Sequence, residues 1–294
     1  MIFVRDDMKD LFPEKSLDEF FQIDGETVKH VVASRRIFRF ERGGKNFYMK
    51  VHFGVGWREI FKNWLQLKAP ILGAEKEWLA IQAFHRREID IETMEIVAYG
   101  KQGTNPATQR SFLITDALEQ TIDLEQWLPP LTYRPLKPER LKLKRAIIRR
   151  VAEIGSRLHD NDMCHRDFYL CHFRIDISDA DPLPDPENMH IYLMDLHRVG
   201  IDANIKPRWR VKDIAGLLYS ALFDAKDLTL TQTDILRFMS AYTGKICRPA
   251  ISDHQDFWLA VLKRVYHTYQ KDHGVPPPWP NYLQAWYLGN DIAV

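Results

Sequence analysis

The sequence predicts an α+β protein of two lobes, the first built mainly from antiparallel strands and the second mostly helical. Two patterns carry this prediction. The first third contains β-branched and aromatic runs separated by turn signals, whereas the second half has the apolar periodicity of amphipathic helices. With 294 residues, 45% of them hydrophobic, the chain is long enough for both lobes. We expect them at residues 1–118 and 119–294.

Composition excludes several classes of protein. Lys and Arg total 41 against 40 Asp and Glu, so no bulk charge favours nucleic acid as a partner. The three cysteines lack CxxC spacing, which argues against zinc and against a disulfide framework. The N-terminus has no signal-peptide pattern, and no apolar run approaches the ~20 residues that span a bilayer. We expect a cytoplasmic protein, with peripheral membrane contact left open.

The elements of the first lobe follow in order. Strands are predicted at 27–33 and 37–41, and Arg42-Gly43-Gly44-Lys45 is a hairpin turn signal. A third strand, 46–53, completes an antiparallel meander and carries Lys50. An amphipathic helix at 74–86 carries Glu77, and two further strands, 95–100 and 111–118, enclose a polar turn.

Between Lys50 and Glu77 lies an additional helix, residues 57–67, with Trp57, Ile60, Phe61, Trp64, Leu65 and Leu67 at near-helical spacing. Arg58, Lys62 and Lys68 border this stripe. Packing onto the first lobe is one interpretation; docking to a bilayer surface, where Trp and Lys are favoured, is the other. Exposed tryptophans would favour the second.

The second half begins with a helix at 136–162, whose basic run at 137–157 is either a solvated face or a surface for a phosphorylated substrate or anionic membrane. It leads into the loop CHRDFYLCHF, residues 164–173. Strands at 171–177 and 190–196 flank an acidic, proline-rich turn, and helices follow at 213–224, 231–243 and 254–272. This order of elements is that of a bilobal protein-kinase-like fold.

Phosphoryl transfer needs a cation on the phosphates, carboxylates on magnesium and a carboxylate near the attacking hydroxyl. Lys50, in mid-strand, suits the phosphates, and Glu77 on a following helix suits pairing with Lys50. Asp167 follows His165 and Arg166 and is placed to accept the proton of an acceptor hydroxyl. Asp195 ends the strand YLMDL, where a kinase places its magnesium-binding aspartate.

Two positions depart from the protein-kinase pattern. His172, five residues after Asp167, stands where those kinases have a magnesium-binding asparagine. It is expected to bind metal through water or to contact phosphate as a cation. No glycine-rich loop precedes Lys50; instead Ser34 with Arg35 or Arg36 covers the phosphates, unless these arginines are simply exposed. Asp213 is expected to hydrogen-bond the backbone of the catalytic loop, a structural role.

The motifs HRDFYLCHF, MDLHRV, KPRWRVKDIAGLLYS, PILGAEKEWLAI and SFLITDAL resemble the lipopolysaccharide core heptose kinases of Gram-negative bacteria. The resemblance runs from about residue 25 to about residue 245. It implies a protein-kinase-like fold and the use of ATP and magnesium. It also implies Asp167 as catalytic base with His165 and Arg166 beside it, Asp195 as magnesium ligand, and Lys50 with Glu77 as the phosphate anchor. That family carries histidine at the position of His172.

The same resemblance implies a hinge bordering adenine at Thr115, Asp116 and Leu118. The expected reaction is phosphorylation of an inner-core heptose on the lipid A–core oligosaccharide precursor, at the cytoplasmic face of the inner membrane. One alternative is a kinase of the same fold acting on another core sugar, such as the octulosonic acid. The other is a non-catalytic module that binds a lipid or protein partner.

Overall fold

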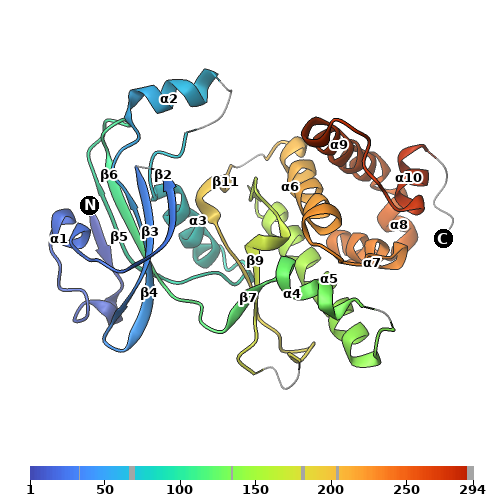
Figure 1. Cartoon of the computed structure of the whole chain (residues 1–294), viewed down its shortest axis with the longest axis horizontal. Helices are drawn as coiled ribbons and strands as arrows, with labels where there is room; N and C mark the ends of the chain where they lie inside the picture. Colours follow the sequence, from blue (N-terminus) through green and yellow to red (C-terminus); the bar gives the residue numbers. More distant parts are fainter. Residues whose placement is uncertain (33, 66–69, 134, 180–182, 203–204, 290–294) are drawn as a thin grey trace. The chain divides into compact units, whose positions relative to one another are not determined.

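The computed structural model describes residues 1–32, 34–65, 70–133, 135–179, 183–202 and 205–289 (Figure 1). The chain folds as two compact units. The first comprises Met1–Arg87, Thr93–Glu119 and Asp195–Val199; the second comprises Glu88–Glu92, Gln120–Met194 and Gly200–Val294. Within the described residues, none of the helices combines the length and apolar character needed to cross a bilayer.

A six-stranded antiparallel sheet forms the frame of the first unit, with strand order β1-β5-β6-β4-β3-β2. The strands are β1 (Ile2–Val4), β2 (Glu26–Val32), β3 (Arg35–Arg42), β4 (Lys45–His52), β5 (Ile96–Gln102) and β6 (Arg110–Asp116). The predicted meander is therefore present as β2, β3 and β4. Gly43 and Gly44, at φ +59° and +73°, make the tight turn between β3 and β4, which suits a hairpin turn with two left-handed residues.

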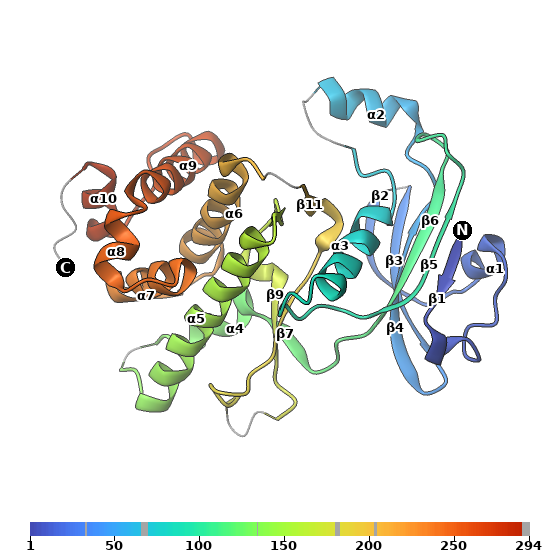
Figure 2. The ribbon, with the colours of Figure 1, turned by 180° about the vertical axis from the view of Figure 1, so that it is seen from behind.

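The two faces of this sheet differ in the residues that pack against them. One face is apolar and packs with α1 (Leu17–Phe21) and the turn η1 (Asp6–Met8) into a core of buried residues such as Phe20, Phe47 and Met49. Because successive strand residues point to opposite faces, Lys50 faces away from this core. There it meets α3 (Glu75–Arg86), which Figures 1 and 2 show on the opposite side of the sheet from α1.

The additional helix between Lys50 and Glu77 is present as α2 (Gly56–Leu65). Residues 66–69 lie outside the described residues, so the predicted end of this helix at residue 67 is not described. Figures 1 and 2 show α2 as a separate helix at one end of the sheet of the first unit.

The second unit is mostly helical, as predicted. Its helices are α4 (Leu124–Leu131), α5 (Pro138–Asp160), α6 (Pro207–Tyr219), α7 (Gln232–Thr243), α8 (Cys247–Ser252), α9 (Gln255–His273) and α10 (Asn281–Tyr287). A π-helical turn, η4 (Ser220–Asp224), continues α6. One small sheet has the order β10-β9-β7, and β8 (Met163–Cys164) pairs with β11 (Gly200–Ile201). The strands of the first are β7 (Thr121–Asp123), β9 (Phe173–Asp176) and β10 (Ile191–Leu193).

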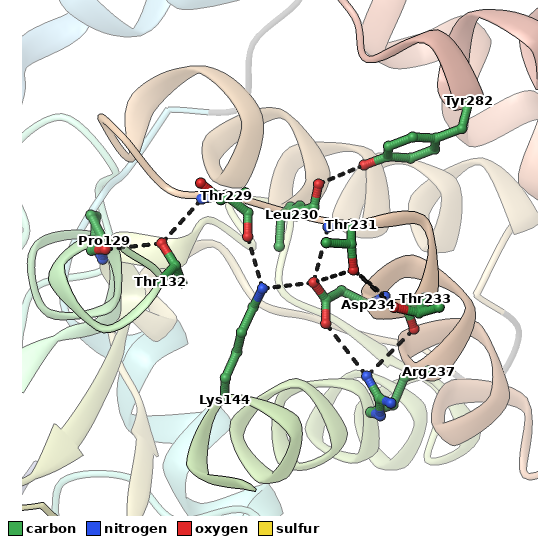
Figure 3. A network of polar contacts seen from close by, with 10 residues as sticks. All are labelled: Pro129, Thr132, Lys144, Thr229, Leu230, Thr231, Thr233, Asp234, Arg237 and Tyr282. Atoms are coloured by element: carbon green, nitrogen blue, oxygen red, sulfur yellow. Dashed lines mark hydrogen bonds and ion pairs between the residues drawn. The ribbon is translucent and has the colours of Figure 1, made fainter. Parts of the chain in front are cut away.

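A buried ion pair ties α5 to α7 (Figure 3). Lys144 Nζ on α5 lies 2.7 Å from Asp234 Oδ2 and donates to the Thr229 carbonyl at 2.8 Å. Asp234 also completes a capping box with Thr231 at the start of α7. Burial alone would raise the pKa of Asp234, but hydrogen bonds from Lys144 and Thr231 outweigh it, so the pKa is lowered. This network fixes the spacing of two long helices.

The strand predicted at 190–196 is too long, because β10 ends at Leu193. Asp195 therefore does not end a strand. It adopts the left-handed conformation, φ 58° and ψ 54°, immediately before the turn η3 (Leu196–Arg198). Aspartate tolerates this conformation better than most residues, so the backbone can leave the strand here.

Candidate active site

An ion pair on the non-core face of the first unit holds Lys50 in place. Its Nζ lies 2.5 Å from Glu77 Oε1 on α3. The Glu77 side chain is 1% exposed and that of Lys50 is 16% exposed. A buried carboxylate needs a charged partner, because an unpaired charge in the interior is costly. The predicted pairing is thus present, and it restricts the direction of the Lys50 side chain.

Positive charge gathers around Lys50 on the same sheet face. Arg35 on β3 is directly opposite His52 on β4, two residues beyond Lys50. Burial, together with the neighbouring Arg35 and Lys50 cations, lowers the pKa of His52 to about 3. Among the described residues, the buried Arg35 Nε has no hydrogen-bond partner. A basic sheet face with an unused donor fits an anionic ligand such as a phosphate.

The two arginines predicted at the phosphate loop have different surroundings. Arg36 is engaged elsewhere: its Nη2 lies 2.6 Å from Asp24 Oδ1, and its guanidinium lies over the Phe38 ring at 4.7 Å. Arg36 therefore matches the interpretation of a surface arginine. Ser34 is half-buried, and its carbonyl accepts from the Phe53 backbone N–H at 3.0 Å. Of the two arginines, Arg35 is therefore the one whose Nε–H is available to a ligand.

The predicted hinge comprises the last two residues of β6 and the segment that follows it. Thr115 is buried and lies opposite Tyr48 of β4, so it shares a sheet face with Lys50. The Asp116 carboxylate instead pairs with Arg5 at 2.7 Å. The backbone N–H of Asp116 donates to the Glu95 carbonyl at 3.1 Å. Any contact of Asp116 with a nucleotide would therefore come from its carbonyl oxygen. Leu118 lies two residues beyond the end of β6.

The Asp195 side chain faces a histidine in the next turn. His197 Nδ1 and Asp195 Oδ1 are hydrogen-bonded, and the Asp195 side chain is 33% exposed. A carboxylate with one oxygen held by a protein donor still presents oxygen to solvent, as a magnesium ligand must. The turn η3 that carries His197 packs against α3.

In the second unit, Asp213 holds the backbone of the loop that contains Asp167. Its Oδ2 accepts from the His165 N–H and its Oδ1 from the Arg166 N–H, both at 2.7 Å. Asp213 is fully buried, so these are charge-assisted bonds in a low-dielectric setting. The predicted structural role of Asp213 is confirmed. Arg166 is left-handed, φ 69°, a strained conformation that such bonds can maintain.

The side chains of the two residues before Asp167 point into the protein rather than outward. His165 is fully buried, and its Nε2 is hydrogen-bonded to the Met194 carbonyl at 2.8 Å. The Arg166 guanidinium lies over the Trp209 ring of α6 at 4.6 Å. Both contacts attach the loop to the rest of the unit. His165 and Arg166, predicted as catalytic residues, thus place their side chains in contacts within the protein beside Asp167.

Lys212, on α6, is a candidate that the sequence did not reveal. Its Nζ donates to the Arg166 carbonyl and lies 3.5 Å from Asp167 Oδ1. The Asp167 side chain is 15% exposed, so it is held yet accessible. The KD pair in WRVKDIAG could have suggested this position, since Asp213 next to it was already expected at the loop.

His172 is fixed by the same loop. Its Nδ1 lies 2.7 Å from the Asp167 carbonyl oxygen, which can only accept, so Nδ1 carries the proton. In the neutral ring, Nε2 then carries the lone pair. The Met194 N–H donates to the His172 carbonyl at 2.8 Å, which links the loop to the segment before Asp195.

The donor set fits magnesium held together with a nucleotide better than a metal held by protein alone. Within the described ranges, no three His, Cys, Asp or Glu side chains cluster as a metal site. Magnesium usually takes one or two carboxylates plus phosphate and water oxygens. Asp195 fits that pattern, while His172 supplies nitrogen, a poorer ligand for this metal.

Half of the basic residues in the run at 137–157 form ion pairs with acidic residues. Lys144 pairs with Asp234, and both Arg150 and Arg157 pair with Asp90. Lys142 lies 3.3 Å from Glu187. Of these residues, Lys144 is buried in its ion pair, whereas the Lys142 side chain is 62% exposed and its pair with Glu187 is a weak surface contact. Arg145 and Arg149 remain exposed.

Comparison with known proteins identifies the family of the chain. The sequence model of the family described as "Lipopolysaccharide kinase (Kdo/WaaP) family" matches residues 18–242 of this chain. The lipopolysaccharide core heptose(I) kinase WaaP of Pseudomonas aeruginosa is 37% identical over 237 residues, 81% of this chain and 84% of the relative. The enzyme of the same name from Escherichia coli is 38% identical over 250 residues, 84% and 87% of the two chains.

A solved structure, "WaaP in complex with acyl carrier protein", covers 92% of this chain and 99% of its own, with a TM-score of 0.73 and 29% identity. The resemblance drawn from the motifs, the kinase-like fold and the assignment as a kinase are thereby confirmed. The chain belongs to the lipopolysaccharide kinase (Kdo/WaaP) family.

Proposed function

We propose that this protein phosphorylates the first heptose of the lipopolysaccharide inner core, using ATP and magnesium. The observation that carries the proposal is the loop that contains Asp167. Asp213 accepts two backbone N–H bonds from this loop at 2.7 Å, and the chain is 37–38% identical to core heptose(I) kinases. The acceptor is part of the lipid A–core precursor, so the reaction is assigned to the cytoplasmic face of the inner membrane. Phosphorylation of another core sugar is the alternative that the assay must separate.

ATP would supply the phosphoryl group, and magnesium would neutralise part of the charge on the phosphates. Lys50, aimed by Glu77, would bind the phosphates, and Arg35 would offer its unused Nε–H to a phosphate oxygen. Asp195 would be the main magnesium ligand, with its second oxygen held by His197. Thr115, Leu118 and the Asp116 carbonyl would border the adenine.

Asp167 would accept the proton of the heptose hydroxyl as that oxygen attacks. The loop is already ordered by Asp213, His165 and His172, so this carboxylate is positioned in advance. The Lys212 ammonium also lies 3.5 Å from Oδ1 of the Asp167 carboxylate. His172 would contact the metal or a phosphate oxygen through Nε2.

The test uses the purified chain with ATP, magnesium and two acceptors: core oligosaccharide that lacks heptose phosphate, and the octulosonic acid alone. We expect magnesium-dependent transfer to the first acceptor, with phosphate located on the first heptose by mass spectrometry and NMR. Asp167→Asn should lower turnover by about 100-fold or more while nucleotide affinity barely changes. The matched control is Asp160→Asn, an exposed aspartate at the end of α5. Transfer to the octulosonic acid only, or full turnover by Asp167→Asn, would contradict the proposal.

A second candidate function is binding of an acyl carrier protein, the partner named for the structural relative. The second unit encloses a cavity of about 120 Å³ whose wall is almost entirely apolar. Its lining includes Ile147, Leu217, Phe238, Met239, Leu262 and Trp286. Such a cavity has room for part of a fatty acyl chain, whose apolar surface leaves water on entry.

If this second function is correct, binding of the carrier protein should depend on its acyl chain. Acylated carrier protein should raise the Tm of the wild-type chain by several degrees, because a ligand of the folded state stabilises it. The carrier without its acyl chain should not do so. Met239→Trp, which narrows the cavity, should reduce the effect. Equal shifts with both carriers would show that the cavity is not the acyl site.

A further inference from the structure

Helix α2 presents an aromatic stripe to solvent. The chain has eight tryptophans, all in the described residues, and the two that are exposed, Trp57 at 47% and Trp64 at 54%, both lie on α2. Between them Phe61 is 52% exposed, and Leu65 is 87% exposed. The rings are in contact, with centroids 5.9 Å apart for Trp57–Phe61 and 5.5 Å for Phe61–Trp64. The stripe is therefore continuous.

One residue of the stripe is buried. Ile60 is 1% exposed, and at the start of α2 the Gly56 N–H donates to the Ala107 carbonyl of the first unit at 2.9 Å. With about 3.6 residues per turn, Ile60 lies at one edge of the apolar arc, and Arg58 and Lys62 lie just beyond the opposite edge. The exposed aromatic rings thus stand between a buried anchor and a basic border.

Nearby residues extend this surface. Phe53, three residues before α2, is 48% exposed and contacts Phe21 at a centroid distance of 5.5 Å. Lys62 is 64% exposed and lies 3.6 Å from Glu59, which is itself exposed, so the pair is weak. So weak a contact leaves the Lys62 ammonium able to exchange Glu59 for an external anion.

We propose that α2 docks on an anionic phospholipid bilayer, with Trp57, Phe61 and Trp64 at the level of the headgroups. Tryptophan is favoured there because its ring is largely apolar and its N–H is polar. Arg58 and Lys62 then bind lipid phosphates. The aromatic stripe with its one-sided basic border is the pattern of a helix that lies in the interface, roughly 5–10 Å deep. The inference rests on the proposed function, which gives the chain an acceptor anchored in a membrane.

The position of α2 in the chain connects docking to the nucleotide residues. The helix, about 15 Å long, stands in the connection between β4, which carries Lys50, and α3, which carries Glu77. Docking therefore holds the first unit at the membrane surface. A lipid-linked acceptor in that surface is then met at high local concentration, which lowers its apparent KM without changing the chemical step.

The first test is co-sedimentation of the full chain with vesicles of phosphatidylcholine, alone or with phosphatidylglycerol. Wild type should bind the anionic vesicles, more weakly as salt rises. Trp57→Ser with Trp64→Ser should lower partition on the order of tenfold, with a Tm within a few degrees of wild type. Arg58→Glu with Lys62→Glu should abolish the preference for anionic vesicles. The matched control is Ile246→Ser with Val275→Ser, two exposed apolar residues of the second unit that should bind like wild type.

The second measurement needs no variant that might fail to fold. Brominated acyl chains should quench tryptophan emission of the wild-type chain, because quenching requires a ring at the bilayer boundary. Wild-type binding by the double tryptophan variant, or absence of quenching in bound wild type, overturns the inference. Concentration-dependent dimers that dissociate in that variant, without vesicle binding by wild type, would assign α2 to a second copy of the chain and overturn it too.

Activity separates this inference from the proposed function. The tryptophan variant should phosphorylate soluble core oligosaccharide like wild type but show a raised KM for lipid-linked acceptor in vesicles. Vesicle binding with no transfer to either acceptor would contradict the proposed function and leave docking standing. Transfer to both acceptors with no vesicle binding would do the reverse.

Discussion

The ammonium group of Lys50 lies 2.5 Å from the carboxylate of Glu77, and Glu77 is almost wholly withdrawn from solvent. Glu77→Gln keeps the size of the side chain but removes the charge that directs Lys50. We expect kcat/KM for Mg-ATP to fall on the order of 100-fold, since Lys50 is then no longer held in position for the phosphates. Steady-state kinetics with varied ATP would measure this.

The control for that variant lies on the same helix. Glu75 pairs with Lys101 at 2.6 Å, but its side chain is 44% exposed. Glu75→Gln should change kcat/KM by no more than about twofold, since exposed pairs are weak. If both variants behave alike, the position of Lys50 does not depend on Glu77.

Lys212→Met should lower kcat about 10- to 100-fold with little change in the KM for ATP. The reason is that Lys212 contacts both the Arg166 carbonyl and the Asp167 carboxylate, so its loss lets the base drift. Lys212→Arg should recover part of the activity. Lys206→Met, at the exposed start of the same helix, is the control. An unchanged kcat in Lys212→Met would remove Lys212 from the positioning of Asp167.

His172→Asn should retain partial activity. The asparagine amide can donate to the Asp167 carbonyl as Nδ1 does now, and its oxygen is a better magnesium ligand than imidazole. Titration of activity with magnesium should therefore show a similar or lower requirement for the metal. Complete loss of activity in a folded variant would mean that His172 acts on phosphate as a cation, which an amide cannot do.

Lys144→Met should lower the free energy of unfolding at neutral pH by about 3–5 kcal/mol, because it leaves Asp234 buried and charged. The pKa of Asp234 is lowered in the folded protein. Its stabilising contribution is therefore complete above the unfolded pKa of about 3.9 and is lost as pH falls through the lower folded value. The difference between wild type and variant should shrink below about pH 4.

Urea unfolding at neutral and at acidic pH would measure that difference. The double change Lys144→Met with Asp234→Leu should recover most of the stability, because apolar residues surround the pair. About 1 kcal/mol should remain lost, since Asp234 also caps α7. A difference that grows in acid would show that the pair does not account for the stability.

The sequence predicted those parts of the fold that local pattern determines. The β2–β4 meander, its glycine turn and the helix carrying Glu77 all follow from residue spacing over short ranges. The order of Lys50, Glu77, Asp167 and Asp195 was readable for the same reason. The roles of these residues in the reaction stay predictions.

Contacts between distant residues could not be read in this way. The three-residue strand β1 exists because Phe3 pairs with Tyr99 of β5, far along the chain. Asp116 turns toward Arg5, 111 residues away, and Lys212 reaches Asp167 across 45 residues. Helical spacing also predicts the same apolar stripe on α2 whether the tryptophans are buried or exposed. Only tertiary packing decides these cases.

The Asp213 carboxylate has a consequence for the timing of catalysis. Loop amides usually exchange with solvent deuterium within seconds, but those of His165 and Arg166 are donated to a fully buried acceptor. Their exchange should wait for opening of the unit as a whole, so this loop behaves like core helix in its motions. In the proposed mechanism, Asp167 on this loop then needs no reorganisation when the substrate arrives. We therefore expect the slow motions of that mechanism in nucleotide entry or product departure.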